Sequence, residues 1–295
     1  MSIKEIAESL YSESPKKTLY HYTSFNGLLG IIKSQSLWAS DIQFFNDSAE
    51  MQHTKNLLNN EISQCLKQGE HDSKLLNQFR DWISHRITNG NMLFVVSLTA
   101  NGNLLSQWRG YCPIGKGVSV GFNPTIISLC ANRQSFLIGK CIYNNAVQNK
   151  IIKNIIKNVK KLANERGENT NPSKRHPSQS FHDIFEEIED DLLRVAAILK
   201  HPSFKEEEEW RVVSPVITNY VKSPILYREG ISMLIPYLEF SLISDNDLTM
   251  NIQHVILGPT PNNKLSITSL SRFLSKNGVS PKDGLETCQI PYREC

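Results

Sequence analysis

Paired cysteines and long apolar runs are both missing from this sequence of 295 residues. The six cysteines are scattered, and none has the C-x-x-C spacing of a zinc or redox site. The longest apolar runs, such as MLFVVSL at 92–98, are too short to cross a bilayer. The opening MSIKEIAESLYSESPKK is polar and lacks the apolar core of a signal peptide. We therefore expect a cytoplasmic protein with reduced thiols and no membrane partner.

Several well-known catalytic and nucleotide-binding motifs are also missing. The sequence has no P-loop, no dinucleotide-binding glycine fingerprint and no G-x-S-x-G nucleophile elbow. The glycines of GKGVSVGF at 115–122 do not follow a βα unit. Without a His-x-x-x-His pair or paired cysteines, we expect no zinc site. The net charge of +3 is too small to indicate binding to nucleic acid through bulk phosphate attraction.

The order of periodic segments predicts an α+β fold. Strands and helices alternate irregularly, which favours a mixed, mainly antiparallel central sheet with helices inserted between its strands. We expect a single domain over 1–295, with a helical insertion at about 145–200 and a short irregular segment at 104–111. The expected strands lie near 18–22, 36–40, 92–98, 115–122, 136–143, 206–216, 231–240, 254–259 and 285–293. Helices are expected near 1–17, 24–34, 49–87, 146–165, 181–199 and 266–277.

A histidine lies between two tyrosines in the first predicted strand, LYHYTS. Alternate residues of a strand share a face, so Tyr20 and Tyr22 point one way while His21 and Thr23 point the other. If the tyrosines pack in the core, His21 faces a cleft and contacts a ligand. The alternative is a structural histidine whose hydrogen bonds are satisfied within the protein.

Two further segments gather polar or aromatic side chains. FFNDSAE at 44–50 carries Asn46 and Asp47, and taken alone this segment favours an ordinary turn and helix cap over a ligand contact. SQWRGY at 106–111 places Trp108 and Arg109 beside a glycine. Trp and Arg together can stack on a flat ring and bind a phosphate. The alternative is that Trp108 belongs to the core and Arg109 lies on the surface, which the sequence does not distinguish from a ligand site.

The acidic run in FKEEEEWRVV enters a predicted strand directly. Period-two alternation places Glu207, Glu209 and Arg211 on the side opposite Trp210 and Val212. Since Trp210 and Val212 mark the buried side, we expect Glu209 and Arg211 to face out from the sheet together. A carboxylate held beside an arginine has a lowered pKa and stays ionised. Such a group suits the stabilisation of a cation better than the donation of a proton.

The order of these segments resembles a bacterial family, domain of unknown function 2971. LYHYTS, FFNDSAE, SQWRGY, EEEEWR and a closing IPYR follow one another from about Leu19 to Arg293. The family itself implies no function. The opening segment is in addition similar to the start of the ADP-ribosyltransferase superfamily, with a strand bearing His-x-Thr, a helix and a short L-x-A-S strand.

The second resemblance implies an ADP-ribosyltransferase-like fold and an enzyme that takes NAD as substrate. A strand histidine then contacts a ribose hydroxyl, an aromatic residue stacks on nicotinamide, and a late-strand glutamate holds the nicotinamide ribose. The catalytic candidates are His21, Tyr111, Glu207 and Glu209, with Trp108 as a second choice for the aromatic residue. The residues expected to bind NAD are Tyr22, Thr23, Asn46, Asp47, Ser97, Gln107, Trp108, Arg109 and Arg211.

Several functions remain open from the sequence. A transferase of this kind would be a toxin or an anti-phage defence effector, with nucleic acid or protein as the acceptor. A non-catalytic nucleotide- or nucleic-acid-binding module would rest on Trp108, Arg109 and the basic helix 146–165. A metal-dependent nuclease would use the glutamate cluster. The acceptor and the oligomeric state are not determined by the sequence.

Overall fold

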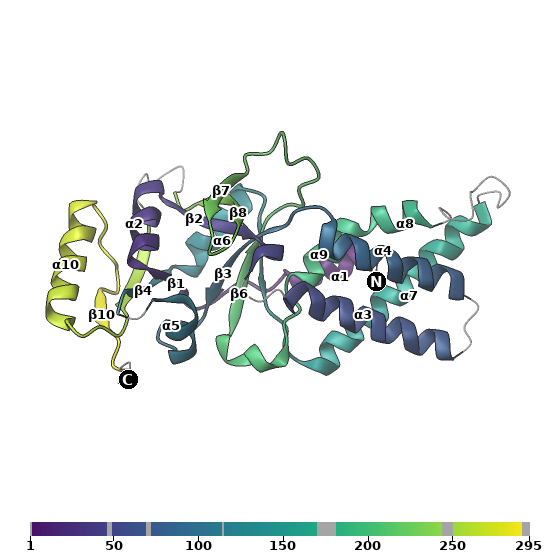
Figure 1. Ribbon diagram of the computed structural model, residues 1–295, viewed down its shortest axis with the longest axis horizontal. Coiled ribbons are helices and arrows are strands. Elements are labelled where there is room, and N and C mark those ends of the chain that lie inside the picture. Colours follow the sequence, from purple (N-terminus) through teal and green to yellow (C-terminus); the bar gives the residue numbers. More distant parts are fainter. Residues whose placement is uncertain are drawn as a thin grey trace.

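A ten-stranded sheet runs through the middle of the molecule in the computed structural model (Figure 1). The structure describes residues 2–45, 49–68, 72–113, 115–169, 181–243 and 250–290. The strand order is β10-β9-β4-β1-β3-β2-β8-β7, while β6 pairs with β3 and β5. The β10–β9 pair is parallel and the other pairs are antiparallel, which confirms the predicted α+β class with a mainly antiparallel sheet. The strands are β1 Leu19–Ser24, β2 Ser36–Asp41, β3 Phe94–Thr99, β4 Gly117–Phe122, β5 Leu137–Lys140, β6 Glu209–Val213, β7 Leu226–Glu229, β8 Leu234–Ser241, β9 Ile252–Leu257 and β10 Leu285–Thr287.

Two groups of helices cover different parts of this sheet. Helices α2, α6 and α10 pack on one face through apolar side chains such as Leu28, Ile127 and Leu274. The remaining long helices gather at one end of the molecule, on the right in Figure 1, and bury a second core that reaches Val95 and Val213 of the sheet. The helices are α1 Ile3–Leu10, α2 Phe25–Ser34, α3 Ala49–Lys67, α4 Ser73–Asn89, α5 Leu105–Tyr111, α6 Pro124–Arg133, α7 Asn145–Asn169, α8 His182–Glu187, α9 Glu189–Ala196 and α10 Asn263–Lys276. Two short 3₁₀ helices are η1 Ile42–Phe44 and η3 Pro202–Glu207.

The central strand β3 has a forked edge. One edge of β3 pairs with β6 from Val95 to Thr99. Since a strand has only two edges, β1 and β2 must share the other one, and they do so at its two ends. Tyr20 of β1 pairs with Thr99, and Ser40 of β2 pairs with Val95. Between these contacts β1 and β2 diverge, and the sheet forks at residues 96–98.

Most predicted elements are confirmed, but the segment 104–111 was predicted wrongly. It forms helix α5 rather than an irregular stretch, with the amide of Trp108 donating to the carbonyl of Leu104. A helix of seven residues has too few turns for its apolar side chains to show a helical period. Helix α6 and strand β7 were not predicted. Strand β7 is exposed, so its residues do not show the alternation of apolar and polar side chains by which a strand is predicted.

Candidate functional site

His21 lies in the fork of the sheet. Its Nδ1 is 3.1 Å from the carbonyl oxygen of Ser97 in β3, so Nδ1 carries the proton and donates it. The imidazole thereby occupies the part of this edge of β3, between the pairings with β1 and β2, that neither strand covers. Burial lowers the pKa of His21, and the hydrogen bond to Ser97 opposes this shift without cancelling it. A neutral His21 protonated at Nδ1 presents Nε2 as a hydrogen-bond acceptor, and its side chain keeps some solvent exposure.

The neighbouring tyrosines of β1, Tyr20 and Tyr22, point to the face of the sheet opposite His21 and make contacts there. Tyr22 is buried, donates to the carbonyl of Asn101 at 2.9 Å and accepts from the amide of Leu104 at 2.8 Å. Its ring packs edge-to-face on Trp108 at 4.6 Å between centroids. The hydroxyl of Tyr20 lies 3.1 Å from Nδ1 of His254. The alternation predicted for LYHYTS is confirmed, with both tyrosines in structural contacts.

Helix α5 separates the residues of SQWRGY into two sets. Gln107 and Trp108 are buried, and Trp108 donates to the side-chain oxygen of Asn103 at 2.9 Å. Trp108 is 2% exposed, so its ring has no open face for stacking on a ligand. Arg109 and Tyr111 are exposed, and 45% of Tyr111 is accessible. Tyr111 is therefore the better placed of the two aromatic candidates.

Glu209 and Arg211 lie side by side, as predicted, but they are buried in an ion network and do not face out from the sheet. Glu207 lies in the 3₁₀ helix η3, before the strand begins, so the predicted alternation does not extend to it. Nε of Arg211 donates to Oε1 of Glu209 at 2.8 Å, and Nζ of Lys200 donates to Oε2 at 2.7 Å. Arg211 also donates to the carbonyl of Ala197, at the end of helix α9, at 2.6 Å. Because Glu209 and Arg211 are fully enclosed, contact of either with a ligand would require this network to open.

The charge state of Glu209 is set by its two cationic partners. Burial alone would raise the pKa of Glu209, but Arg211 and Lys200 together lower it to about 2. The predicted ionised carboxylate is thus present. Its negative charge is already balanced by the two cations, so Glu209 stabilises a positive charge that develops on a bound sugar less than an unbalanced carboxylate would.

Lys200 joins the two glutamates that the sequence singled out. Its Nζ donates to Oε2 of Glu207 at 2.6 Å as well as to Glu209. The side chain of Glu207 is 12% exposed, whereas that of Glu209 is 5% exposed. Sequence reasoning missed Lys200, because a lysine nine positions before a glutamate forms no recognisable motif. Of the two glutamates, Glu207 is the one closer to solvent.

The strand register relates His21 to these glutamates. Tyr20, Thr99 and Glu209 are aligned across β1, β3 and β6. Directly paired residues share a face, so the adjacent His21 belongs to the face opposite Glu209. Adjacent strands are about 4.8 Å apart, which puts β1 and β6 about 10 Å apart at this row. A ligand that contacts both side chains must therefore pass through the fork.

Other expected site residues are placed as follows. Ser97 contributes its carbonyl to His21, and the carbonyl of Thr23 accepts from the Cys112 thiol at 3.4 Å. Asn46, Asp47 and the Pro291–Arg293 part of IPYR lie outside the described residues. Two cavities among the described residues lie away from the fork, one at the helical end and one beside Trp108 and Gly258. Within the same residues, no group of three His, Cys, Asp or Glu side chains is arranged to hold a metal ion.

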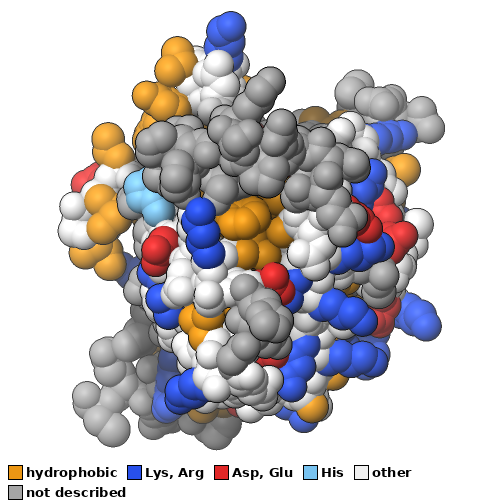
Figure 2. Space-filling view, turned by 90° about the vertical axis from the view of Figure 1, so that its right-hand side faces the viewer, with side chains coloured by type: hydrophobic (Ala, Val, Ile, Leu, Met, Phe, Trp, Pro, Cys, Tyr) orange, Lys and Arg blue, Asp and Glu red, His pale blue; other side chains and the backbone are white. Residues whose placement is uncertain are grey.

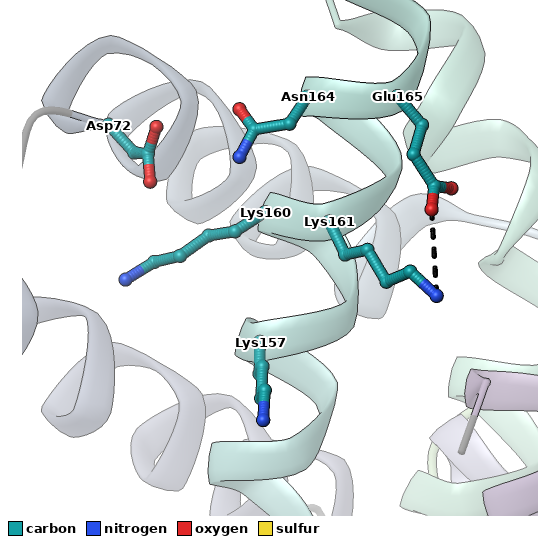
Figure 3. A pocket seen from close by; sticks show the side chains of 6 residues that line it. All are labelled: Asp72, Lys157, Lys160, Lys161, Asn164 and Glu165. Atoms are coloured by element: carbon teal, nitrogen blue, oxygen red, sulfur yellow. Dashed lines mark ion pairs between the residues drawn. The ribbon is translucent and has the colours of Figure 1, made fainter.

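The larger of the two cavities lies on the helical end and is lined by lysines. It is an open hollow of about 430 Å³ (Figure 3), and its lining residues are Asp72, Lys157, Lys160, Lys161, Asn164 and Glu165. Figure 3 shows Lys160 and Asn164 on the side of Asp72, while Lys161 turns to Glu165 at 3.5 Å. Lys and Arg side chains gather on one side of this end of the molecule in Figure 2.

Comparison with known proteins finds a resemblance to one family. Residues 107–212 match the model of the family described as Protein of unknown function (DUF2971), which confirms the predicted resemblance over this segment. The matched segment runs from helix α5 into strand β6 and contains Tyr111, Glu207 and Glu209. His21 lies outside it. No curated protein and no solved structure matches the chain at a significant level.

Proposed function

We propose that this protein is an ADP-ribosyltransferase-like enzyme that uses NAD as its substrate at the fork of the sheet. The observation that carries the proposal is the imidazole of His21 in the fork of β3, one strand away from the glutamate-bearing start of β6. These three segments are far apart in the sequence and adjacent in the sheet. The resemblance to the superfamily lies in two of them, β1 and the start of β6.

The chemistry assigns a different task to each side chain. Transfer breaks the bond between nicotinamide and C1′ of the ribose, and nicotinamide leaves with the bonding electron pair. A new bond then forms between C1′ and an acceptor atom, which loses its proton. Nε2 of His21 accepts a hydrogen bond from a ribose hydroxyl, and Tyr111 offers its exposed ring to the nicotinamide.

Glu207 is the carboxylate that we assign to the reacting ribose. Positive charge develops on the sugar as nicotinamide leaves, and a preorganised anion stabilises that charge. Glu207 is more exposed than Glu209, and Lys200 holds it in place. Glu209, Lys200 and Arg211 then act as positioning residues beneath it. The exposed Arg109 is the arginine that we assign to the pyrophosphate.

The proposal extends to the setting in which the reaction takes place. We assign the protein to the cytoplasm, with nucleic acid or protein as the acceptor and a role as a toxin or an anti-phage defence effector. The described residues include no helix both long and apolar enough to cross a bilayer. The five described cysteines are buried thiols, which suits a reducing compartment.

Incubation with NAD labelled in the nicotinamide ring tests the proposed reaction. We expect labelled nicotinamide to be released in proportion to protein concentration, with ADP-ribose appearing free or on an added acceptor. Chromatography of the small molecules separates nicotinamide from intact NAD. NAD that stays intact with both oligonucleotide and protein acceptors present would exclude the activity.

A lysine stripe on helix α7 favours a second candidate function, the binding of nucleic acid without chemistry. At 100° per residue, the lysines of α7 fall within about 100° of the helix circumference and extend about 16 Å along its axis. The stripe consists of Lys150, Lys153, Lys157, Lys160 and Lys161, and all but the half-buried Lys160 are exposed. Lysines in such a row match the repeated charges of a phosphate backbone.

Salt-dependent binding of a labelled single-stranded oligonucleotide tests this second function. Changing Lys153, Lys157 and Lys161 to Ala should weaken binding and reduce the slope of log affinity against log salt by about 2. The control changes three exposed lysines elsewhere, Lys264, Lys276 and Lys282, to Ala. Equal losses in both triple variants would show that the stripe is an ordinary solvated face.

A further inference from the structure

The segment from Tyr220 to Leu234 exposes an unusual amount of apolar surface. Val221 is 77% exposed, and Ile231, at the turn between β7 and β8, is fully exposed at 107%. The exposed apolar side chains of the segment are Tyr220, Val221, Leu226, Tyr227, Ile231, Met233 and Leu234. Hydrophobic side chains are also visible on the part of the molecule that projects at the top of Figure 2, at the height of the projecting loop before β7 in Figure 1. Exposed apolar side chains gathered in one short segment indicate an interaction site on a folded protein.

The backbone of this segment offers a second means of association. Strand β7 ends the order of the sheet and pairs with β8 from Leu226↔Tyr237 to Glu229↔Leu234. No strand of the described residues pairs with its other edge. Exposed edges are usually protected by proline, by lysine or by a covering element. Strand β7 has neither proline nor lysine, and its two charged residues, Arg228 and Glu229, have opposite signs.

The size of the exposed surface fits a second protein chain. At roughly 100 to 150 Å² for each side chain, the seven residues expose on the order of 800 Å². This is about the area that one partner contributes to an interface of standard size. An edge strand is complementary to its own copy, because two antiparallel copies related by a two-fold axis can pair their free backbone groups. Neighbouring charges of opposite sign allow the same pairing without net repulsion.

We propose that the β7–β8 hairpin, together with the apolar loop before it, is the interface of a symmetric homodimer. Each chain contributes the same patch, and β7 of one chain lies antiparallel to β7 of its partner, so that the sheet continues from one chain into the other. The seven apolar side chains then lose their contact with water. This interface is independent of the NAD reaction, because the hairpin contributes no residue to the fork.

Sedimentation equilibrium of the full chain over a range of concentrations tests the proposal. The wild type should approach twice the chain mass of 33.5 kDa. Changing Ile231 and Met233 together to Glu should raise the dimer dissociation constant by about 100-fold, because charges replace apolar side chains that the dimer buries. Both side chains are exposed in the single chain, so the thermal melting of the monomer should be unchanged.

A control and a competing ligand complete the test. Leu265, on helix α10, is 75% exposed, and its change to Glu should leave the dimer intact. Cosedimentation with vesicles of anionic phospholipid asks whether the same patch is instead a membrane contact. A wild type that stays monomeric at all concentrations, with or without vesicle binding, would overturn the homodimer. Equal weakening of the dimer by the Leu265 variant would overturn the assignment of the hairpin.

Discussion

Changing Glu207 to Gln should lower the rate of nicotinamide release by about 10²- to 10³-fold while the protein stays folded. Gln keeps the shape of the side chain and can still accept a hydrogen bond from Lys200, but it carries no charge. Because the carboxylate is assigned to the charge that develops on the ribose, kcat should fall more than the affinity for NAD. Steady-state release of labelled nicotinamide, with NAD affinity measured separately by calorimetry, separates the two effects.

The neighbouring glutamate supplies the control for this change. Glu206 is exposed and lies on the same short helix, so Glu206→Gln removes the same charge from the adjacent position. We expect this variant to release nicotinamide at the rate of the wild type. Equal rates for the wild type, Glu206→Gln and Glu207→Gln would remove Glu207 from the reaction.

Changing Lys200 to Met should destabilise the protein by about 3 to 5 kcal/mol, the usual result of removing one partner from a buried ion network. Lys200 and its partner Glu209 are both enclosed in the protein. Without the ammonium, Arg211 alone must balance Glu209, and Glu207 loses its bond to Nζ. Urea unfolding monitored by circular dichroism measures the loss. The exposed Lys205→Met, on the 3₁₀ helix η3, should change the free energy of unfolding by no more than about 0.5 kcal/mol.

The same network gives the stability a defined dependence on pH. The pKa of Glu209 is about 2 in the folded protein and 4.5 in an ordinary glutamate. A carboxyl whose folded pKa is depressed stabilises the protein above its unfolded pKa and loses that contribution as the pH falls to the folded value. Between pH 4.5 and 2 the wild type should therefore lose roughly 3 kcal/mol through this group. Glu209→Gln should lack this part of the acid dependence, and an identical acid transition in both proteins would refute the assignment.

The sequence predicted strands best where a strand is buried in the sheet. The continuous apolar run at 92–98 predicted a central strand, and β3 is the strand at which the sheet forks. The alternation in EWRVV correctly predicted that Glu209 and Arg211 share a side. Both features are local, because a side chain's direction along a strand depends only on the pattern of its neighbours.

The features that decide the site depend on contacts between distant segments. The burial of Trp108 follows from its packing on Tyr22 of β1, and the enclosure of Glu209 follows from Lys200 and from the end of helix α9. Trp108 and Tyr22 are far apart in the sequence, and Lys200 lies nine positions before Glu209, so neither pair forms a motif that the sequence alone would reveal. The fork at Ser97 likewise results from the divergence of two strands that the sequence separates by a helix. Such features become predictable only when the pairing of the strands is known.

The central claim is that NAD binds at the fork with a ribose hydroxyl on His21, and the imidazole itself reports on it. The chain has eight histidines, so the nitrogen spectrum of their rings contains one candidate signal and seven internal controls. On titration with NAD, the Nε2 signal of His21 should shift and saturate, while the signals of histidines distant from the fork stay in place. Saturable NAD binding that leaves His21 unchanged, or no binding at all, would contradict the account.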